Sequence, residues 1–126
     1  MSHRIVALDH VQLAMPPGEE EKAEAFYCDL LGFEVLEKPP VLAARGGRWF
    51  GADGGRVQVH LGVEDDFRPA RKAHPAIVVE WLDELAASLE AAGCPVRFDT
   101  DNPGVRRFYV DDPFGNRIEI VASSPS

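Results

Sequence analysis

The sequence predicts an α+β fold built from two copies of a βαβββ module. Three observations support this prediction: an amphipathic helix pattern occurs twice, strand patterns flank each helix in the same order, and the second half repeats the spacing of the first. Gly32 precedes Gln58 by 26 residues, and Gly93 precedes Glu119 by 26 residues. Each half has only about 55 residues and cannot cover its own sheet, so the halves are expected to pack together or against those of another chain.

The length of 126 residues suits a single domain over residues 1–126. Within it we expect module one at residues 4–62, a linker at residues 63–73 and module two at residues 74–122. The predicted linker holds the charged stretch that separates the two helix-and-strand patterns.

The elements of module one follow in order. Residues 5–14 are rich in Val, Leu and Ile, and a Pro-Pro-Gly turn ends them, which predicts a strand. Acidic residues at positions 19–21 then suit the start of a helix, and Gly32 suits its end. One apolar face spans that helix, formed by Ala23, Phe26, Tyr27, Leu30 and Leu31. Three further strands are predicted at residues 33–36, 48–50 and 56–59.

Module two repeats this order. A strand is predicted at residues 75–80, and Gly93 ends a helix whose apolar face is formed by Leu82, Leu85, Ala86 and Leu89. The remaining strands are predicted at residues 95–98, 107–109 and 117–120. The turn at residues 111–116 contains Pro113 and Gly115, which favour a tight reversal before the last strand.

Composition excludes several classes of function. There are 13 Lys and Arg residues against 21 Asp and Glu residues, giving a net charge of −8. An acidic chain without a basic block argues against binding to nucleic acid or to an anionic membrane surface. Two cysteines, Cys28 and Cys94, are too few for a disulfide framework. No apolar stretch is long enough for a membrane span and no basic leader opens the chain, so a cytoplasmic protein is expected.

Four polar residues occupy equivalent positions in the predicted repeat: His10 and His74 in the first strands, Gln58 and Glu119 in the last. Imidazole, carboxylate and amide groups suit a divalent transition metal, and a pseudo-twofold axis would bring the four together. Repeat symmetry favours Gln58 as the ligand from this strand. His60 lies two positions on, on the same strand face, and is the second choice, although an imidazole is the better metal ligand. Each residue has a structural alternative as well, such as a hydrogen-bonded histidine or a solvent-facing carboxylate.

Several segments resemble the vicinal oxygen chelate superfamily, which includes glyoxalases, epimerases, extradiol dioxygenases and bleomycin-binding proteins. The resemblance covers residues 5–121 and rests on residues 9–11, the helix end Phe26-Tyr27-Cys28-Asp29-Leu30-Leu31-Gly32-Phe33, residues 74–76 and Asp112-Pro113-Phe114-Gly115-Asn116-Arg117-Ile118-Glu119. It implies a curved, cup-shaped mixed sheet with helices outside. It also implies a divalent ion (Mn, Fe, Co, Ni, Zn or Mg) held by His10, Gln58, His74 and Glu119, a set most similar to the epimerase branch.

The same resemblance implies a metal-dependent lyase or isomerase, active as a homodimer on a small substrate that chelates the metal through neighbouring oxygens, with an enolate or oxyanion intermediate. Glu119 would be the catalytic proton carrier. The candidate substrate-binding residues are Arg48, Trp49, Phe50, Arg107 and Tyr109. The arginines among them, with Arg45, could pair with an anionic substrate group, and the alternative is that they are ordinary exposed loop charges. Two alternatives stay open: a metal-free drug-binding protein of the bleomycin-resistance type, and a dioxygenase that uses His10, His74 and Glu119.

Overall fold

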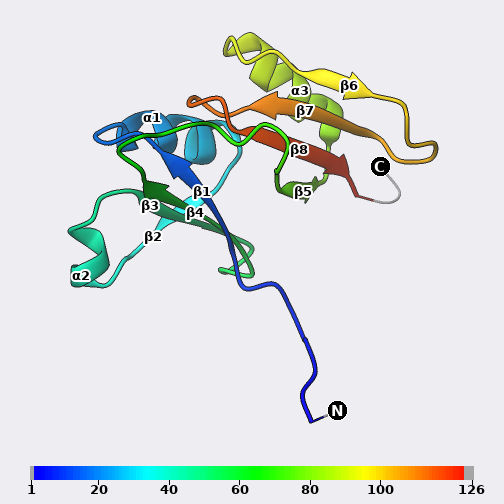
Figure 1. The fold of residues 1–126 in the computed structure, drawn as a ribbon. Coiled ribbons are helices and arrows are strands. Elements are labelled where there is room, and N and C mark those ends of the chain that lie inside the picture. The colour runs from blue at the N-terminus through cyan, green and yellow to red at the C-terminus, as the bar shows by residue number, and fades with distance from the viewer. Residues whose placement is uncertain (1, 124–126) are drawn as a thin grey trace.

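Two four-stranded mixed sheets and a shared set of helices make up the fold (Figure 1). The computed structural model describes residues 2–123. Module one comprises β1 (Val11–Met15), α1 (Glu20–Glu24), the π-helix η1 (Ala25–Leu30), β2 (Glu34–Leu36), α2 (Pro40–Ala43), β3 (Arg48–Ala52) and β4 (Val57–Val63). Module two comprises β5 (Ala76–Val79), α3 (Leu82–Ala91), β6 (Arg97–Asp99), β7 (Arg107–Asp111) and β8 (Arg117–Ala122).

The strand order is the same in both modules and confirms the predicted βαβββ repeat. One sheet has the order β1-β4-β3-β2, and the other has the order β5-β8-β7-β6. In each sheet the first strand runs parallel to the last, and the remaining pairs are antiparallel. The two sheets are hydrogen-bonded separately and are not closed into a barrel.

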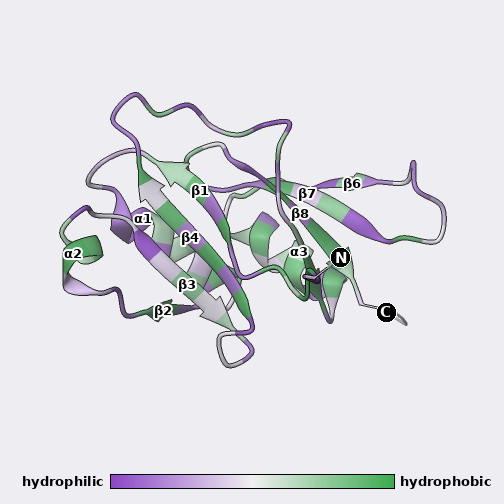
Figure 2. Cartoon of the chain, turned by 60° about the horizontal axis from the view of Figure 1, so that its bottom comes forward, coloured by the Kyte–Doolittle hydropathy of each residue, from purple (hydrophilic) through white to green (hydrophobic). Residues whose placement is uncertain are grey.

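The hydrophobic core lies where one face of each sheet meets the helices. Apolar and polar residues alternate along β4 and β7 (Figure 2). Successive side chains of a strand point to opposite faces, so the apolar ones lie on the core face. The core includes fully buried side chains from both modules, and η1 contacts α3. The largest are Tyr27, Phe50, Phe108, Met15, Leu61, Leu82, Leu89, Ile118 and Ile120.

A buried polar cluster joins the two modules at this core. Tyr27 of η1 donates its hydroxyl to Asp112 Oδ2 at 2.7 Å, across 85 residues of sequence. Asn116 Nδ2 donates to the same carboxylate and to the Ala14 carbonyl, both at 2.9 Å. Asn116 Oδ1 accepts a hydrogen bond from the backbone N–H of Ala70 in the linker. The Asp-Pro-Phe-Gly-Asn turn therefore fastens module two to module one, besides shaping the turn itself.

The structure departs from the sequence predictions at three points near the candidate residues. The first strand begins at Val11 rather than residue 5, and the segment before it is extended and exposed, with Ile5 90% exposed. The fifth strand likewise begins at Ala76. His10 and His74 therefore precede their strands instead of lying within them. The one-turn helix α2 was not predicted, because four residues give no measurable periodicity.

No helix among residues 2–123 is long and apolar enough to cross a membrane.

Candidate functional site

The register of the two sheets defines which residues are equivalent between the modules. In module one, His60 pairs with Gln12 of β1 and with Trp49 of β3. In module two, Glu119 pairs with Ala76 of β5 and with Tyr109 of β7. His10 lies two residues before Gln12, and His74 lies two residues before Ala76. The structure thus matches His10 with His74, and His60 with Glu119.

This register corrects the repeat alignment that favoured Gln58. Gly32 precedes His60 by 28 residues, whereas Gly93 precedes Glu119 by 26, because module one has one extra residue before β3 and one more in the β3–β4 turn. Equal spacing from the glycine therefore selects Gln58, although the equivalent position is His60. The side chains of Gln58 and His60 lie on the same face of β4.

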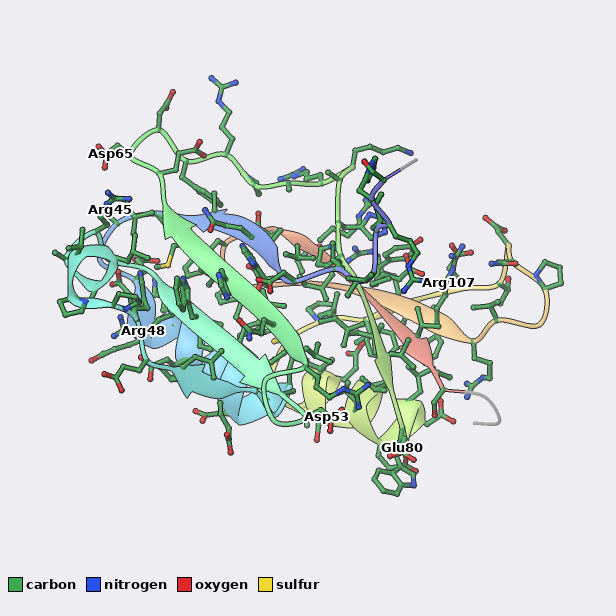
Figure 3. The ribbon with its side chains drawn as sticks, turned by 90° about the horizontal axis from the view of Figure 1, so that it is seen from below. Arg45, Arg48, Asp53, Asp65, Glu80 and Arg107 are labelled. Atoms are coloured by element: carbon green, nitrogen blue, oxygen red, sulfur yellow. The ribbon has the colours of Figure 1, made fainter. Side chains whose placement is uncertain are left out.

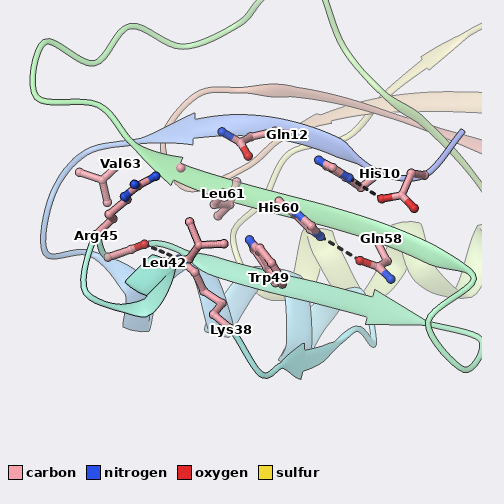
Figure 4. Close-up of a pocket in the computed structure, with 13 residues that line it drawn as sticks. His10, Gln12, Lys38, Leu42, Arg45, Trp49, Gln58, His60, Leu61 and Val63 are labelled. Atoms are coloured by element: carbon pink, nitrogen blue, oxygen red, sulfur yellow. Dashed lines mark hydrogen bonds and ion pairs between the residues drawn. The ribbon is translucent and has the colours of Figure 1, made fainter. Parts of the chain in front are cut away.

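The half-site of module one, defined here as His10 and His60, is ordered by stacking and hydrogen bonds (Figure 4). The His60 ring stacks on His10 at 4.1 Å and on Trp49 at 4.4 Å between ring centroids. Gln58 donates its amide to the Gly55 carbonyl, so its oxygen faces His60 Nε2 at 2.9 Å. Nε2 of His60 is then the protonated nitrogen, and Nδ1 carries the lone pair.

Burial and the neighbouring His10 lower the pKa of His60, so its imidazole is neutral at pH 7. A neutral imidazole is the form that binds a metal. His10 is oriented in the way common for metal-binding histidines, because its Nδ1 lies 2.8 Å from Asp9 Oδ2, which leaves the lone pair on Nε2.

The half-site of module two, defined here as His74 and Glu119, is held by a second network. His74 Nδ1 lies 2.9 Å from the Lys72 carbonyl oxygen, and His74 Nε2 lies 2.9 Å from Glu119 Oε1. Both imidazole nitrogens thus face oxygen acceptors, and a neutral imidazole can donate to only one of them. An imidazole nitrogen and a carboxylate oxygen are both groups that would bind a divalent metal.

Arg107 anchors Glu119 from the neighbouring strand. Its Nη1 donates to Glu119 Oε2 at 3.2 Å, and its Nη2 donates to Asp99 at 3.0 Å. The guanidinium also lies 5.8 Å from the Tyr109 ring centroid, and His74 packs edge-on against that ring at 5.5 Å. Arg107 and Tyr109 therefore lie beside the module-two half-site, on the same face of the sheet.

The five residues proposed for substrate binding divide between two sheet faces. Trp49, Arg107 and Tyr109 share the face of the half-sites. Arg48 and Phe50 alternate with Trp49 and lie on the helix-covered face, where Arg48 pairs with Glu24 at 3.0 Å and Phe50 stacks on Tyr27. Arg48 and Phe50 are therefore structural residues here. Figure 3 shows Arg48 and Arg107 on different modules.

Sequence reasoning missed Asp9, Asp99 and Lys38 as neighbours of the site. Asp9 and Asp99 act through a hydrogen-bonded partner, which sequence spacing does not reveal. Lys38 lines the same cavity as His60, from the connection between β2 and α2.

The two half-sites do not converge within the chain. Across residues 2–123, no three His, Cys, Asp or Glu side chains form a group able to hold a metal ion. Each module presents one histidine before its first strand and one ligand-type residue on its last. The donor chemistry fits a divalent metal, with three imidazoles and one carboxylate, but each module supplies only half of it.

The protein-family model of the Glyoxalase/Bleomycin resistance protein/Dioxygenase superfamily matches residues 7–120 of this chain. The chain belongs to this superfamily. Its fold is also shared by solved structures. A glyoxalase family protein from Bacillus anthracis is 46% identical, with a TM-score of 0.92, 98% of this chain covered and 100% of that one. TnmS3, an antibiotic binding protein from Streptomyces sp. CB03234, is 25% identical, with a TM-score of 0.71 and 95% and 100% covered.

The fosfomycin resistance protein FosX from Listeria monocytogenes is 19% identical, with a TM-score of 0.71 and 97% of each chain covered, which shows a common fold. Among curated proteins, none matches the chain.

Proposed function

We propose that this superfamily member is a metal-dependent lyase or isomerase of the glyoxalase or epimerase type, acting on a small oxygenated substrate. Its ligands are His10 and His60 from module one, and His74 and Glu119 from module two. The observation that carries the proposal is the matched pair of half-sites, in which the same two positions of each module bear metal-ligand side chains. Gln58 serves as the hydrogen-bond partner that orients His60 rather than as a ligand.

We propose further that a complete site forms between two copies of the chain, with module one of one copy facing module two of the other. The support is twofold. The half-sites lie apart within the described chain, and the segment leading to His10 exposes apolar side chains that a second copy would cover. Ile5, Val6 and Leu8 are each more than three-quarters exposed. A homodimer of this kind would hold two equivalent sites.

The proposed chemistry uses the chain's own groups as follows. A bound divalent ion would act as a Lewis acid toward neighbouring substrate oxygens. Glu119 is the group placed to accept and return a proton, through an oxygen that Arg107 keeps oriented. Trp49 and Tyr109 supply apolar walls on the two half-sites, which favour exclusion of water from the substrate. A dioxygenase with His10, His74 and Glu119 as its two-histidine, one-carboxylate set is a further alternative.

A binding protein without chemistry is the second candidate. The stack of His10, His60 and Trp49 offers an aromatic surface suited to a planar ligand. TnmS3, which is described as an antibiotic binding protein, has the same fold. Under this alternative the histidines bind ligand directly and hold no metal.

Metal content tests the proposal. The protein is purified without chelator, loaded with each candidate divalent ion, dialysed and analysed for bound metal, alongside His60→Ala and the matched control Gln58→Ala. We expect about one ion per chain in the wild type, little in His60→Ala and near-normal content in Gln58→Ala. Absence of metal from the wild-type protein under every loading condition contradicts the proposed metal-dependent function. Loss in Gln58→Ala alone restores Gln58 as the ligand.

A further inference from the structure

The cavity over module one extends well beyond His10 and His60. It has a volume of about 450 Å³ and runs along the face of β4 from these histidines toward α2 (Figure 4). Trp49 lies in the middle of the lining, and Lys38, Leu42 and Arg45 lie at the far end. Module two has no helix between β6 and β7, so α2 and the far end of the cavity are specific to module one.

That far end, defined here by Lys38 and Arg45, is positively charged in a chain of net charge −8. Lys38 Nζ donates to the Gly46 carbonyl at 2.6 Å, which fixes the ammonium group and leaves two N–H donors. Arg45 is exposed and makes no ion pair within residues 2–123.

The cavity lining contains the carboxylate of Asp9, and the carboxylate of Glu20 lies beside Gly46. Glu20 accepts a hydrogen bond from the Gly47 backbone N–H at 2.9 Å. Asp9 lies at the opposite end, bonded to His10. Burial, followed by the charge of Arg48, lowers the pKa of Lys38, and Glu20 only partly opposes this effect. The far end therefore carries two cationic side chains, whose charge Glu20 offsets only in part.

We propose that Lys38 and Arg45 bind an anionic oxygen group of the substrate, a carboxylate or a phosphoryl group, while the rest of the substrate passes Trp49 and reaches His10 and His60. Guanidinium and ammonium groups form charge-assisted hydrogen bonds with such oxygens, and Trp49 and Leu42 supply the apolar wall between the two polar ends. The inference rests on the proposed function for the end that faces the histidines. Binding of the anion itself requires no metal.

Trp49 fluorescence gives a direct readout. The chain has two tryptophans, and Trp81 is 73% exposed and does not line the cavity, so Trp81→Phe leaves Trp49 as the single reporter. This protein is titrated with inorganic phosphate and, separately, with malonate, at constant ionic strength set by sodium chloride. Each titration is performed with chelator and with loaded metal. We expect saturable quenching or enhancement in both conditions, and the stronger of the two probes identifies the anion class.

Arg45→Gln is the main test, because among residues 2–123 Arg45 makes no ion pair whose loss could destabilise the fold. Lys38→Gln is the second variant. Arg56→Gln is the matched control. Arg56 is exposed, pairs with Asp53 at 3.0 Å and does not line the cavity. Each cavity variant should weaken probe binding by about tenfold, whereas the control should not.

Equal affinity in Arg45→Gln and wild type, or no saturable change at all, overturns the inference. Metal content separates this result from the proposed function. If the wild-type protein binds phosphate but holds no metal under any loading condition, only the proposed metal-dependent function is refuted. Normal metal content without anion binding refutes only the anion site.

Discussion

Replacing Tyr27 by Phe tests how the two modules are held together. The substitution removes one hydroxyl and leaves the ring stacked on Phe50 at 5.1 Å between centroids. The hydroxyl donates to Asp112 at 2.7 Å, and both residues are buried. The remaining donors to Asp112 are the backbone N–H groups of Phe114 and Asn116 and the Asn116 side chain. The carboxylate therefore stays in the core with one donor fewer.

A hydrogen bond to a buried charged group contributes about 1.5–3 kcal/mol, and we expect Tyr27→Phe to lower the free energy of unfolding by that amount at neutral pH. The pH dependence follows from Asp112. Burial raises its pKa above the ordinary value, and the hydrogen bond from Tyr27 opposes that rise. Since the folded pKa exceeds the unfolded one, Asp112 favours folding most at low pH and loses this contribution as the pH rises through the folded pKa.

Removal of the Tyr27 hydroxyl raises the pKa of Asp112 further, so the stability penalty should be largest where Asp112 is ionised. Urea unfolding at pH 7 and near pH 4, at one protein concentration, measures both quantities. Tyr109→Phe is the matched control, because no hydrogen bond of its hydroxyl is found in the described chain, and it should change stability by less than about 0.5 kcal/mol. A Tyr27→Phe penalty no larger than the control's, or one that grows on acidification, refutes the reasoning.

Two further predictions concern the same framework. Asn116→Ala should destabilise the fold by about 2–3 kcal/mol, because it leaves the Ala14 carbonyl and part of Asp112 without a donor; thermal unfolding that matches wild type would contradict this. Gly47→Ala should lower the melting temperature more than Gly93→Ala. Both glycines have positive φ (+83° and +85°), but only at Gly47 would the new methyl group overlap the Leu61 carbonyl oxygen. Equal melting temperatures in the two variants would show that the clash is absorbed.

Much of the fold could be predicted from the sequence because it depends on local signals. Apolar periodicity predicts the helical segment of each module, which is α1 with η1 in module one and α3 in module two, and Gly32 and Gly93 lie just beyond their ends. The strand order followed from the repeat. The first strand begins at Val11 rather than at the predicted residue 5. Residues 5–10 have strand-forming side chains but no neighbouring strand to pair with. Hydrogen bonding to β4 begins only at Val11.

The candidate site was predicted less completely, because its details depend on register. A single extra residue in each of two connections moves the equivalent position from Gln58 to His60, and equal spacing from a glycine does not reveal such insertions. Alternation along β3 placed Arg48 and Phe50 on the helix side, although an Arg-aromatic-aromatic pattern suggested otherwise. The separation of the two half-sites is a tertiary property that no local pattern encodes.

The central claim is that one metal site combines module one of one copy with module two of another. Two differently tagged chains are co-expressed, one with His10→Ala and His60→Ala, the other with His74→Ala and Glu119→Ala, and the mixed pair is purified through both tags. Each variant alone should hold no metal, whereas the mixed pair should hold about half the wild-type amount per chain, since one of its two sites is intact. A mixed pair without metal, when the wild type holds about one ion per chain, would contradict the claim.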